Sequence, residues 1–151
     1  MKKKIIAVDL FCGAGGLTRG LLDTGIKVKK GFDNDPALKK TYESNNFGVK
    51  FYCKDIAMLR KKELLKDLDI GDNYFLLAGC APCQPFSNIN RTNKTRDQRK
   101  NLLMQFGRLV RQTLPDFVFI ENVPGLKSGR GKRIFHKFEN ILKDNGYHYV
   151  S

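Results

Sequence analysis

The most informative stretch of the sequence covers residues 5–23, which read IIAVDLFCGAGGLTRGLLD. Its first residues are mostly β-branched or apolar and predict a buried strand over residues 5–9. The glycines that follow permit a tight turn, and the apolar spacing over residues 16–23 predicts a helix. A strand, a glycine turn and a helix in this order favour an α/β fold that binds a ligand at the turn.

The rest of the chain continues the alternation of strands and helices. We expect further strands at residues 28–33, 49–53, 74–78 and 117–120, and further helices from Pro36 and at residues 60–66, 101–114 and 134–145. This order predicts an α/β fold with a doubly wound, mostly parallel sheet. The apolar run 117–120 predicts a strand covered on both faces. Gly146 is a natural helix end, and residues 147–151 look like a sixth strand, so the fold is expected to be incomplete at its C-terminal end.

Composition limits the class of protein. The 151 residues suffice for about one domain, and 41% hydrophobic with 28% charged residues is typical of a soluble globular chain. No apolar run is long enough for a signal peptide or a membrane span, so we expect a cytoplasmic protein. The net charge is +13, and residues 84–137 hold twelve Lys or Arg against three Asp or Glu. Such a surface attracts polyanions, although it also serves solubility.

The glycine turn has an acidic partner. Asp33 lies twenty residues beyond Gly13, at the predicted end of the second strand, where a carboxylate can accept hydrogen bonds from ribose hydroxyls. The turn departs from the G-x-G-x-x-G dinucleotide pattern, because Leu17, Thr18 and Arg19 follow its last glycine. A turn made only for packing stays an alternative. We favour a nucleoside-containing cofactor, whose identity the spacing leaves open.

A proline–cysteine loop follows the predicted fourth strand, with residues 79–87 reading GCAPCQPFS. Cys83 stands beside Pro82 in a segment too irregular for the core, which suits a nucleophile held by a rigid turn. Residues 88–99 are almost wholly polar and could close over phosphates. Two rivals use the pair Cys80 and Cys83: a redox site, or half of a metal site that lacks a second ligand pair. An inert structural cysteine is a third.

The predicted fifth strand ends at Glu121-Asn122-Val123. Because the carboxyl ends of neighbouring parallel strands converge, Glu121 could lie near Cys83. Burial beside the apolar run would favour a protonated carboxyl that can act as a proton donor. The alternative is a local helix cap, and this motif is weak evidence when taken alone.

Together, residues 9–17, the run 82–87 (PCQPFS) and the run 121–123 (ENV) closely resemble the cytosine-C5 DNA methyltransferase family, over nearly the whole chain. The resemblance implies a Rossmann-like methyltransferase fold and a restriction-modification role. It also implies S-adenosylmethionine as methyl donor and duplex DNA as substrate. Methyl transfer would then go to C5 of a flipped cytosine through a covalent bond between Cys83 and C6. Methylation of RNA instead of DNA is a variant of this hypothesis.

The resemblance also assigns residues. It implies catalytic roles for Cys83, Glu121 and Asn122, with Glu121 acting at N3 of the base. The implied cofactor residues are Asp9, Phe11, Cys12, Gly13, Gly15, Gly16, Leu17, Asp33, Asn34, Asp55, Ile56, Pro82 and Leu102. The implied nucleic-acid contacts are Gln84, Ser87, Arg91, Arg96 and Arg99. Family members commonly have Glu followed by an aromatic residue where this chain has Asp33 and Asn34. Stacking on adenine is therefore expected from elsewhere, with Phe11 as the candidate.

The second half of the family pattern is absent from these residues: the Gln-x-Arg-x-Arg segment, the target-recognition domain and a C-terminal Asn-containing element. We therefore expect residues 1–151 to be a partial catalytic domain that needs a complementing polypeptide. A split enzyme, a fragment covering one domain and a truncated gene product all fit this expectation. Alone, the chain should bind cofactor weakly and methylate poorly. A catalytically inactive cofactor- or DNA-binding remnant is the main alternative, and a thiol oxidoreductase using Cys80 and Cys83 is a further one. The DNA target and the oligomeric state are not predicted.

Overall fold

Strands and helices alternate along the part of the chain that the computed structural model describes, residues 2–81, 102–121 and 131–150. Contacts divide the chain into two units. The first unit runs to Cys80 and includes Pro115–Ile120, and the second comprises Ala81–Leu114 and Glu121–Ser151. The two units are considered separately below.

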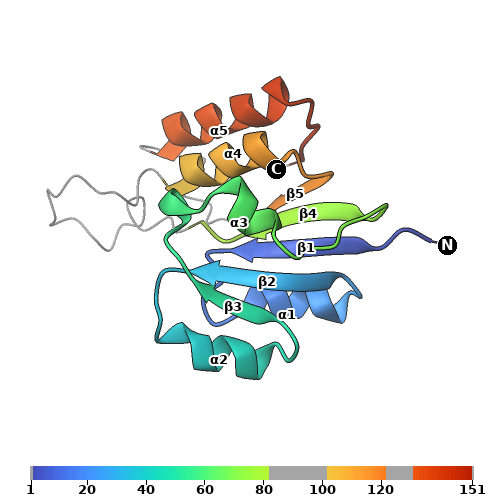
Figure 1. Ribbon diagram of the computed structural model, residues 1–151. Coiled ribbons are helices and arrows are strands. Elements are labelled where there is room, and N and C mark those ends of the chain that lie inside the picture. Colours follow the sequence, from blue (N-terminus) through green and yellow to red (C-terminus); the bar gives the residue numbers. More distant parts are fainter. Residues whose placement is uncertain (1, 82–101, 122–130, 151) are drawn as a thin grey trace, which may run out of the picture. The chain divides into compact units, whose positions relative to one another are not determined.

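The first unit contains a five-stranded, fully parallel sheet (Figure 1). Its strands are β1 (Ile5–Leu10), β2 (Lys27–Asp33), β3 (Lys50–Cys53), β4 (Tyr74–Gly79) and β5 (Phe117–Ile120). Their spatial order is β3-β2-β1-β4-β5, so the winding direction reverses between β1 and β4. This is the doubly wound parallel sheet that the alternation predicts. In such sheets ligands bind outside the carboxyl ends of the strands at the reversal point.

The carboxyl ends of the strands are in register. Leu10 at the end of β1 pairs with Phe32 on one side and Gly79 on the other, and Gly79 pairs with Ile120 at the end of β5. Neighbouring strands lie about 4.8 Å apart, so the segments that follow β1, β4 and β5 leave the same edge within roughly 10 Å. The residues predicted to carry chemistry follow these strand ends.

One face of the sheet is covered by α1 (Gly16–Asp23) and α2 (Leu38–Asn45) (Figure 1). The core on this face includes Ala7, Leu21 and Tyr42. The pairing of β1 with β2 shifts by one residue, because Ala7 pairs with Val28 but Val8 pairs with Lys30. This bulge sends the Lys30 side chain to the opposite face.

On that opposite face the buried ammonium of Lys30 donates to carbonyl oxygens at the end of α3 (Lys61–Leu65), those of Leu64 and Lys66. Its ammonium also lies 5.4 Å from the centre of the Tyr52 ring. Burial lowers the pKa of Lys30 from its ordinary value. The carbonyl groups of a helix end and an aromatic ring therefore replace water around this cation.

The start of the second helix differs from the prediction by two residues. The sequence suggests Pro36 as the first helical residue, but α2 begins at Leu38. The Asp35 carboxylate accepts a hydrogen bond from the backbone N–H of Ala37, so residues 35–37 form a turn closed by this side chain. An aspartate that binds the backbone two residues ahead competes with helix formation at this point.

The predicted coverage of residues 117–120 on both faces is wrong. Phe117 and Phe119 each retain 46% of their surface exposed. Phe117 and Phe119 lie on the same face of β5, whereas Val118 and Ile120 on the other face are partly buried, so one face of this strand is poorly covered. An apolar run of four residues is equally compatible with a central strand and with an edge strand.

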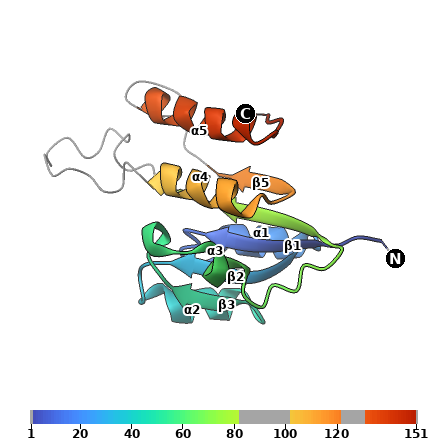
Figure 2. The same ribbon diagram turned by 45° about the horizontal axis from the view of Figure 1, so that its top comes forward.

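The second unit contains α4 (Leu102–Thr113) and α5 (Lys132–Asp144), which pack side by side (Figure 2). The rings of Phe106 and Phe138 meet edge to face, with their centres 6.1 Å apart. Gly107 permits this approach, because a Cβ at that position would lie 2.8 Å from Cδ1 of Ile141. Among the described residues, none of the helices is long and apolar enough to cross a membrane.

The expected sixth strand at residues 147–151 is wrong for residues 147–150, which have no regular secondary structure. After α5, Gly146 adopts a φ of 80°, and the N–H groups of Gly146 and Tyr147 donate to the carbonyls of Lys143 and Leu142. This is a Schellman motif, as Gly146 predicts. The Tyr149 hydroxyl then donates to Glu139 at 3.0 Å, so the segment folds back along its own helix instead of pairing with a strand.

Candidate functional site

The glycine turn between β1 and α1 has a left-handed backbone at three positions. Phe11, Gly13 and Gly15 have φ angles of 57°, 53° and 92°. Glycine adopts this conformation freely, but a phenylalanine in it is strained. Strained residues gather where a ligand site requires a particular backbone shape. The half-buried Phe11 therefore marks this turn as a candidate binding site.

Asp33, at the end of β2, lies beside this turn. One oxygen of its carboxylate accepts a hydrogen bond from the backbone N–H of Gly13 at 3.0 Å. The other oxygen accepts from the N–H of Asp35 at 3.1 Å. Each carboxylate oxygen has a second acceptor position, so the half-buried Asp33 can still bind hydroxyl groups. The structure thus brings together the turn and the acid that the sequence pairs at a spacing of twenty residues.

A chain of buried polar side chains lies behind the turn. The Thr18 hydroxyl donates to the Asp9 carboxylate at 2.7 Å and lies 2.8 Å from the Tyr42 hydroxyl. All three residues are fully buried. Burial raises the pKa of Tyr42 well above its ordinary value, so its hydroxyl stays protonated and remains a donor. Asp9 is thus placed within the protein, behind the glycine turn, and its carboxylate holds the first helix through Thr18.

The end of helix α2 contacts the glycine turn. A Cβ on Gly15 would lie 1.9 Å from Nδ2 of Asn46, and the amide of Asn45 donates to the Ala14 carbonyl at 3.0 Å. A Cβ on Gly31 would lie 2.3 Å from the Tyr42 hydroxyl. Sequence reasoning missed these supporting residues. The sequence contains one signal that could have indicated them. Tyr42 and Asn46 are four residues apart, so they lie on the same side of the helix that follows Asp33.

The Cys12 thiol lies inside this site but is not a nucleophile. It is 5% exposed, and burial raises the pKa of its thiol far above the usual range, with Asp9 and Asp33 adding to the effect. A thiol kept protonated is inert. The backbone N–H of Cys12 donates to the Phe32 carbonyl at 3.1 Å, so this residue ties the turn to β2.

The predicted adenine contacts Asp55 and Ile56 follow β3. Asp55 caps the short 3₁₀ helix η1 (Ile56–Met58) by accepting from the N–H of Ala57 at 2.8 Å. Ile56 is 2% exposed, so Asp55 is the exposed member of the pair. The preceding residue, Lys54, donates its backbone N–H to the Asp33 carbonyl at 2.7 Å. This bond places the Asp55 segment next to the end of β2.

Lys54 also bridges to Glu63 at the start of α3. Its ammonium lies 3.0 Å from one oxygen of Glu63, and Arg60 binds the other oxygen through its side chain at 2.9 Å. These hydrogen bonds, with that of Arg60 largest, lower the pKa of Glu63 to about 2. The carboxylate therefore ties the segment after β3 to α3 at neutral pH.

Three of the remaining predicted residues, Leu102, Asn34 and Glu121, are among those that the structure describes. Leu102 begins α4, and Asn34 is exposed directly after β2. The expected burial of Glu121 is wrong, because this residue is exposed where the chain leaves the edge strand β5. The other predicted site residues lie outside the described residues: Pro82, Cys83, Asn122, Gln84, Ser87, Arg91, Arg96 and Arg99.

The relatives of this chain that are found by sequence comparison include type II methylases. The chain is 40% identical to the type II methylase M.HgiDII of Herpetosiphon aurantiacus over 141 residues, covering 93% of this chain and 39% of the relative. It is 33% identical to the type II methyltransferase M.BsuFI of Bacillus subtilis over 144 residues, covering 95% of this chain and 33% of the relative. The chain therefore spans between a third and two fifths of the length of these proteins.

Solved structures have the same fold. An E. coli prophage-encoded protein, described as a DNA modification methyltransferase, matches with a TM-score of 0.76 at 30% identity, over 93% of this chain and 38% of that chain. The Dnmt2 methyltransferase of S. pombe matches in fold with a TM-score of 0.70 at 24% identity, over 96% of this chain and 43% of that chain. The model of one family, the C-5 cytosine-specific DNA methylases, matches residues 5–151. Because that match spans nearly the whole chain, and because the glycine turn and Asp33 meet where β1 and β2 end, this chain belongs to the C-5 cytosine-specific DNA methylase family.

Proposed function

We propose that this chain carries the cofactor-binding and nucleophile-bearing part of an enzyme that methylates C5 of cytosine in duplex DNA. The observation that supports this most directly is the meeting of the glycine turn and Asp33 at the carboxyl ends of β1 and β2, next to the point where the winding direction of the sheet reverses. The segments that hold Cys83 and Glu121 begin at this same edge, after β4 and β5. Relatives named as type II methylases favour a role in a restriction-modification system, and we place the reaction in the cytoplasm.

S-adenosylmethionine is the methyl donor in this proposal, and the residues around the turn fit it. Asp33 has acceptor capacity left for ribose hydroxyls, and the strained Phe11 stands at the turn as a ring for adenine. Asp55 follows Lys54, whose backbone N–H donates to the Asp33 carbonyl at 2.7 Å. The residues that would contact the cofactor are Phe11, Gly13, Gly15, Gly16, Leu17, Asp33, Asn34, Asp55, Pro82 and Leu102. The buried Asp9, Cys12 and Ile56 would support the site from within the protein. When bound, it supplies an electrophilic methyl group on a sulfonium centre.

Cys83 would act as the nucleophile toward the target base. Cytosine C5 is a weak nucleophile and is hidden in the duplex, so the base has to be flipped out first. Addition of the Cys83 thiolate to C6 forms an S–C6 bond and moves electron density onto C5 and N3. C5 can then accept a methyl group. Loss of the proton from C5 and breakage of the S–C6 bond restore the ring and release Cys83.

Glu121 would act at N3 of the same base. Negative charge develops on the ring when the thiolate adds to C6, and a carboxyl group at N3 can donate a proton or stabilise a protonated ring. Asn122 follows directly and would help to position the base. Gln84, Ser87, Arg91, Arg96 and Arg99 would contact the DNA, with the arginines on backbone phosphates.

A complementing polypeptide segment would supply target recognition, either from a longer form of this chain or from a separate subunit. The chain spans 39% and 33% of two relatives, which leaves most of their length unmatched. Phe117 and Phe119 on the edge strand β5 are each 46% exposed, and such an apolar edge favours coverage by another segment. We propose that residues 1–151 form a partial catalytic domain.

Covalent trapping tests this proposal. A duplex with 5-fluorocytosine at the target position cannot lose a proton from C5, so the S–C6 bond should persist after methyl transfer. We expect an adduct that survives denaturing electrophoresis when the chain, S-adenosylmethionine and the duplex are combined with the C-terminal part of M.HgiDII. The adduct should disappear in Cys83→Ala and persist in Cys80→Ala.

The two cysteine variants separate the possible outcomes. An adduct that survives Cys83→Ala would show that the nucleophile is assigned wrongly. If no adduct forms with any variant while the chain still binds duplex DNA, the chain is a non-catalytic binding remnant. Disappearance of the adduct in Cys80→Ala as well would point to a role for the pair of cysteines.

A further inference from the structure

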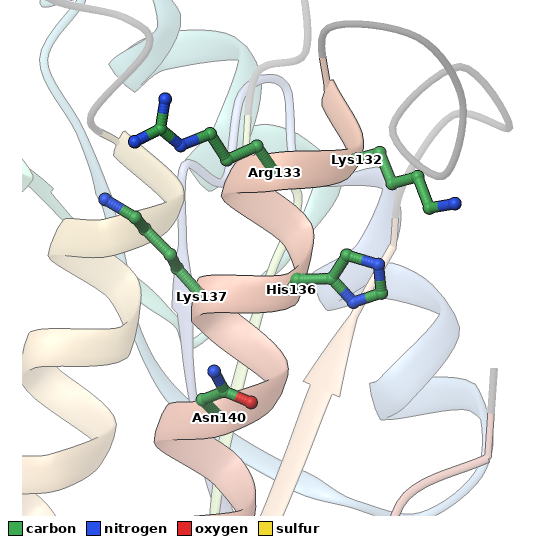
Figure 3. Close-up of a pocket in the computed structure, with 5 residues that line it drawn as sticks. All are labelled: Lys132, Arg133, His136, Lys137 and Asn140. Atoms are coloured by element: carbon green, nitrogen blue, oxygen red, sulfur yellow. The ribbon is translucent and has the colours of Figure 1, made fainter.

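Helix α5 has a strongly basic exposed face. Five residues on it line an open depression of about 500 Å³ (Figure 3): Lys132, Arg133, His136, Lys137 and Asn140. All five are exposed. At about 100° per residue they cover an arc of roughly 140° around the helix, opposite the arc that contains the buried Phe138 and Leu142. The helix is therefore divided lengthwise into a packed apolar side and an open basic side.

Three side chains of this face, those of Lys132, Arg133 and Lys137, carry a positive charge that no acid neutralises within the described part of the chain. No ion pair joins Lys132, Arg133 or Lys137 to an acid among residues 2–81, 102–121 and 131–150. Glu139, which is the nearest acid along the helix, is already bound by His136 at 2.7 Å and by the Tyr149 hydroxyl at 3.0 Å. Figure 3 shows Arg133 and Lys137 on one side of α5 and Lys132 with His136 on the other, so the charges flank the depression.

This arrangement is unfavourable for the helix itself. The first turn of α5 contains Lys132 and Arg133 and no acid, and its N-cap residue Gly131 provides no side-chain cap. Cations in a first turn oppose the helix dipole, and like charges one turn apart repel each other. An anion bound here would relieve both effects. A surface that stays basic at this cost is more readily explained by binding than by solubility alone.

We propose that the basic face of α5 binds the sugar–phosphate backbone of duplex DNA, outside the reacting base. This proposal rests on the proposed function, because DNA is the polyanion on which a cytosine methylase acts. Lys132 and Lys137 are about 7.5 Å apart along the helix axis, a span over which one DNA strand presents about two to three phosphates. Lysine and arginine bind phosphates as point charges and forks without reading sequence. The face would therefore add affinity and leave target choice unchanged.

The salt dependence of DNA binding tests this proposal. The variant Lys132→Gln/Arg133→Gln/Lys137→Gln removes three cations from the face. Lys39→Gln/Lys40→Gln/Lys62→Gln removes three exposed lysines from α2 and α3 and serves as the matched control. Both are made in the Cys83→Ala background and titrated with a fluorescent 20-base-pair duplex by anisotropy at several salt concentrations. Each lost phosphate contact should reduce the slope of log K against log salt by about 0.9.

We expect the magnitude of the slope of log K against log salt to decrease by about 2 to 3 in the α5 variant and by less than about 0.5 in the control. An equal fall in both variants, or no fall in the α5 variant, would overturn the proposal. A loss of binding to duplex RNA without a loss on duplex DNA would overturn it too. If the triple variant fails to fold by circular dichroism, the three single variants should each lower the slope by about 0.9. These titrations measure DNA binding and use no 5-fluorocytosine. A failure to form the adduct would therefore leave them interpretable, and a failure of the salt-dependence prediction would leave the adduct experiment interpretable.

Discussion

At the scale of single residues, the glycine turn is held by hydrogen bonds whose direction can be assigned. Thr18 has one hydroxyl proton and gives it to Asp9, so the Tyr42 hydroxyl has to be the donor toward Thr18. Each such bond contributes about 0.5–1.5 kcal/mol, and leaving a buried partner unsatisfied costs about 1–3 kcal/mol. These hydrogen bonds join Asp9, Thr18 and Tyr42 within the protein, so the turn can keep its shape without a ligand. Asp33 then faces a preformed binding position.

The first residue-scale prediction concerns Glu63 and pH. Its pKa is lowered to about 2 in the folded chain by Arg60 and Lys54, below its ordinary value of 4.5. A carboxyl whose pKa is lowered on folding stabilises the fold above the ordinary value, and this contribution is lost as the pH falls toward 2. Glu63→Gln should therefore reduce the free energy of unfolding at pH 7. The difference from the unchanged chain should shrink below pH 4.5 and vanish near pH 2 in urea titrations.

A matched control for this prediction is Asp72→Asn, since Asp72 is exposed and has no ion pair among residues that the structure describes. This variant should leave the unfolding curve at pH 7 nearly unchanged. A Glu63→Gln difference that stays constant from pH 7 to pH 2 would contradict the account of the ion pair.

The residues of the site differ in how far the sequence could predict them. The approach of Asp33 to Gly13 follows from a spacing that recurs in α/β folds, so the sequence was sufficient. The role of Tyr42 was not predictable in the same way. It depends on Gly31, which lies eleven residues away on a neighbouring strand and makes room for the phenol ring. Such contacts belong to tertiary packing and leave no periodic signal.

At the scale of elements, the contact of α2 with the sheet depends on one missing side chain. A Cβ on Gly31 would lie 2.3 and 2.4 Å from the hydroxyl and Cζ of Tyr42, although its backbone angles suit any residue. Gly31→Ala should therefore force α2 away from β2 and destabilise the chain by about 1–3 kcal/mol. Thermal unfolding should show this as a clear fall in melting temperature, with weaker cofactor binding because α2 supports the turn.

Gly20→Ala is the control for this prediction. Gly20 lies inside α1, and a Cβ there would meet nothing within 4 Å. Alanine in a helix interior is favoured over glycine by about 0.5–1 kcal/mol, so this variant should be slightly more stable. A Gly31→Ala chain as stable as the Gly20→Ala chain would refute the packing argument.

The strand boundaries were predicted accurately from the sequence, but the exposure of β5 and the conformation of residues 147–150 were not. The five described strands lie within one or two residues of the predicted ranges, because short apolar runs flanked by glycine, proline and acids are clear signals. Whether a strand is central or at an edge depends on its partners, so the exposure of β5 was not predictable from its four residues. Residues 147–150 have an apolar and aromatic pattern typical of a strand, but the contact of Tyr149 with Glu139 holds them against α5.

At the scale of the whole molecule, charge and length are consistent with a polypeptide that works together with others. Residues 84–137 contain most of the excess positive charge, and the basic face of α5 begins within them. The chain spans 39% of the length of M.HgiDII, and under the proposed function a complementing segment supplies target recognition. The sequence predicted the family from three short motifs.

Cofactor binding by this chain alone tests the central claim most directly. Isothermal titration with S-adenosylmethionine should show saturable binding at one site. Asp33→Asn keeps the size of the side chain but removes its charge, and a hydrogen bond to a charged group contributes about 1.5–3 kcal/mol, so binding should weaken about 10- to 100-fold. Asp35→Asn, two residues beyond Asp33, and Cys83→Ala, which removes the proposed nucleophile, should bind S-adenosylmethionine as the unchanged chain does. Absence of saturable binding, or equal affinity in Asp33→Asn and Asp35→Asn, would contradict the assignment of this edge of the sheet as the cofactor site.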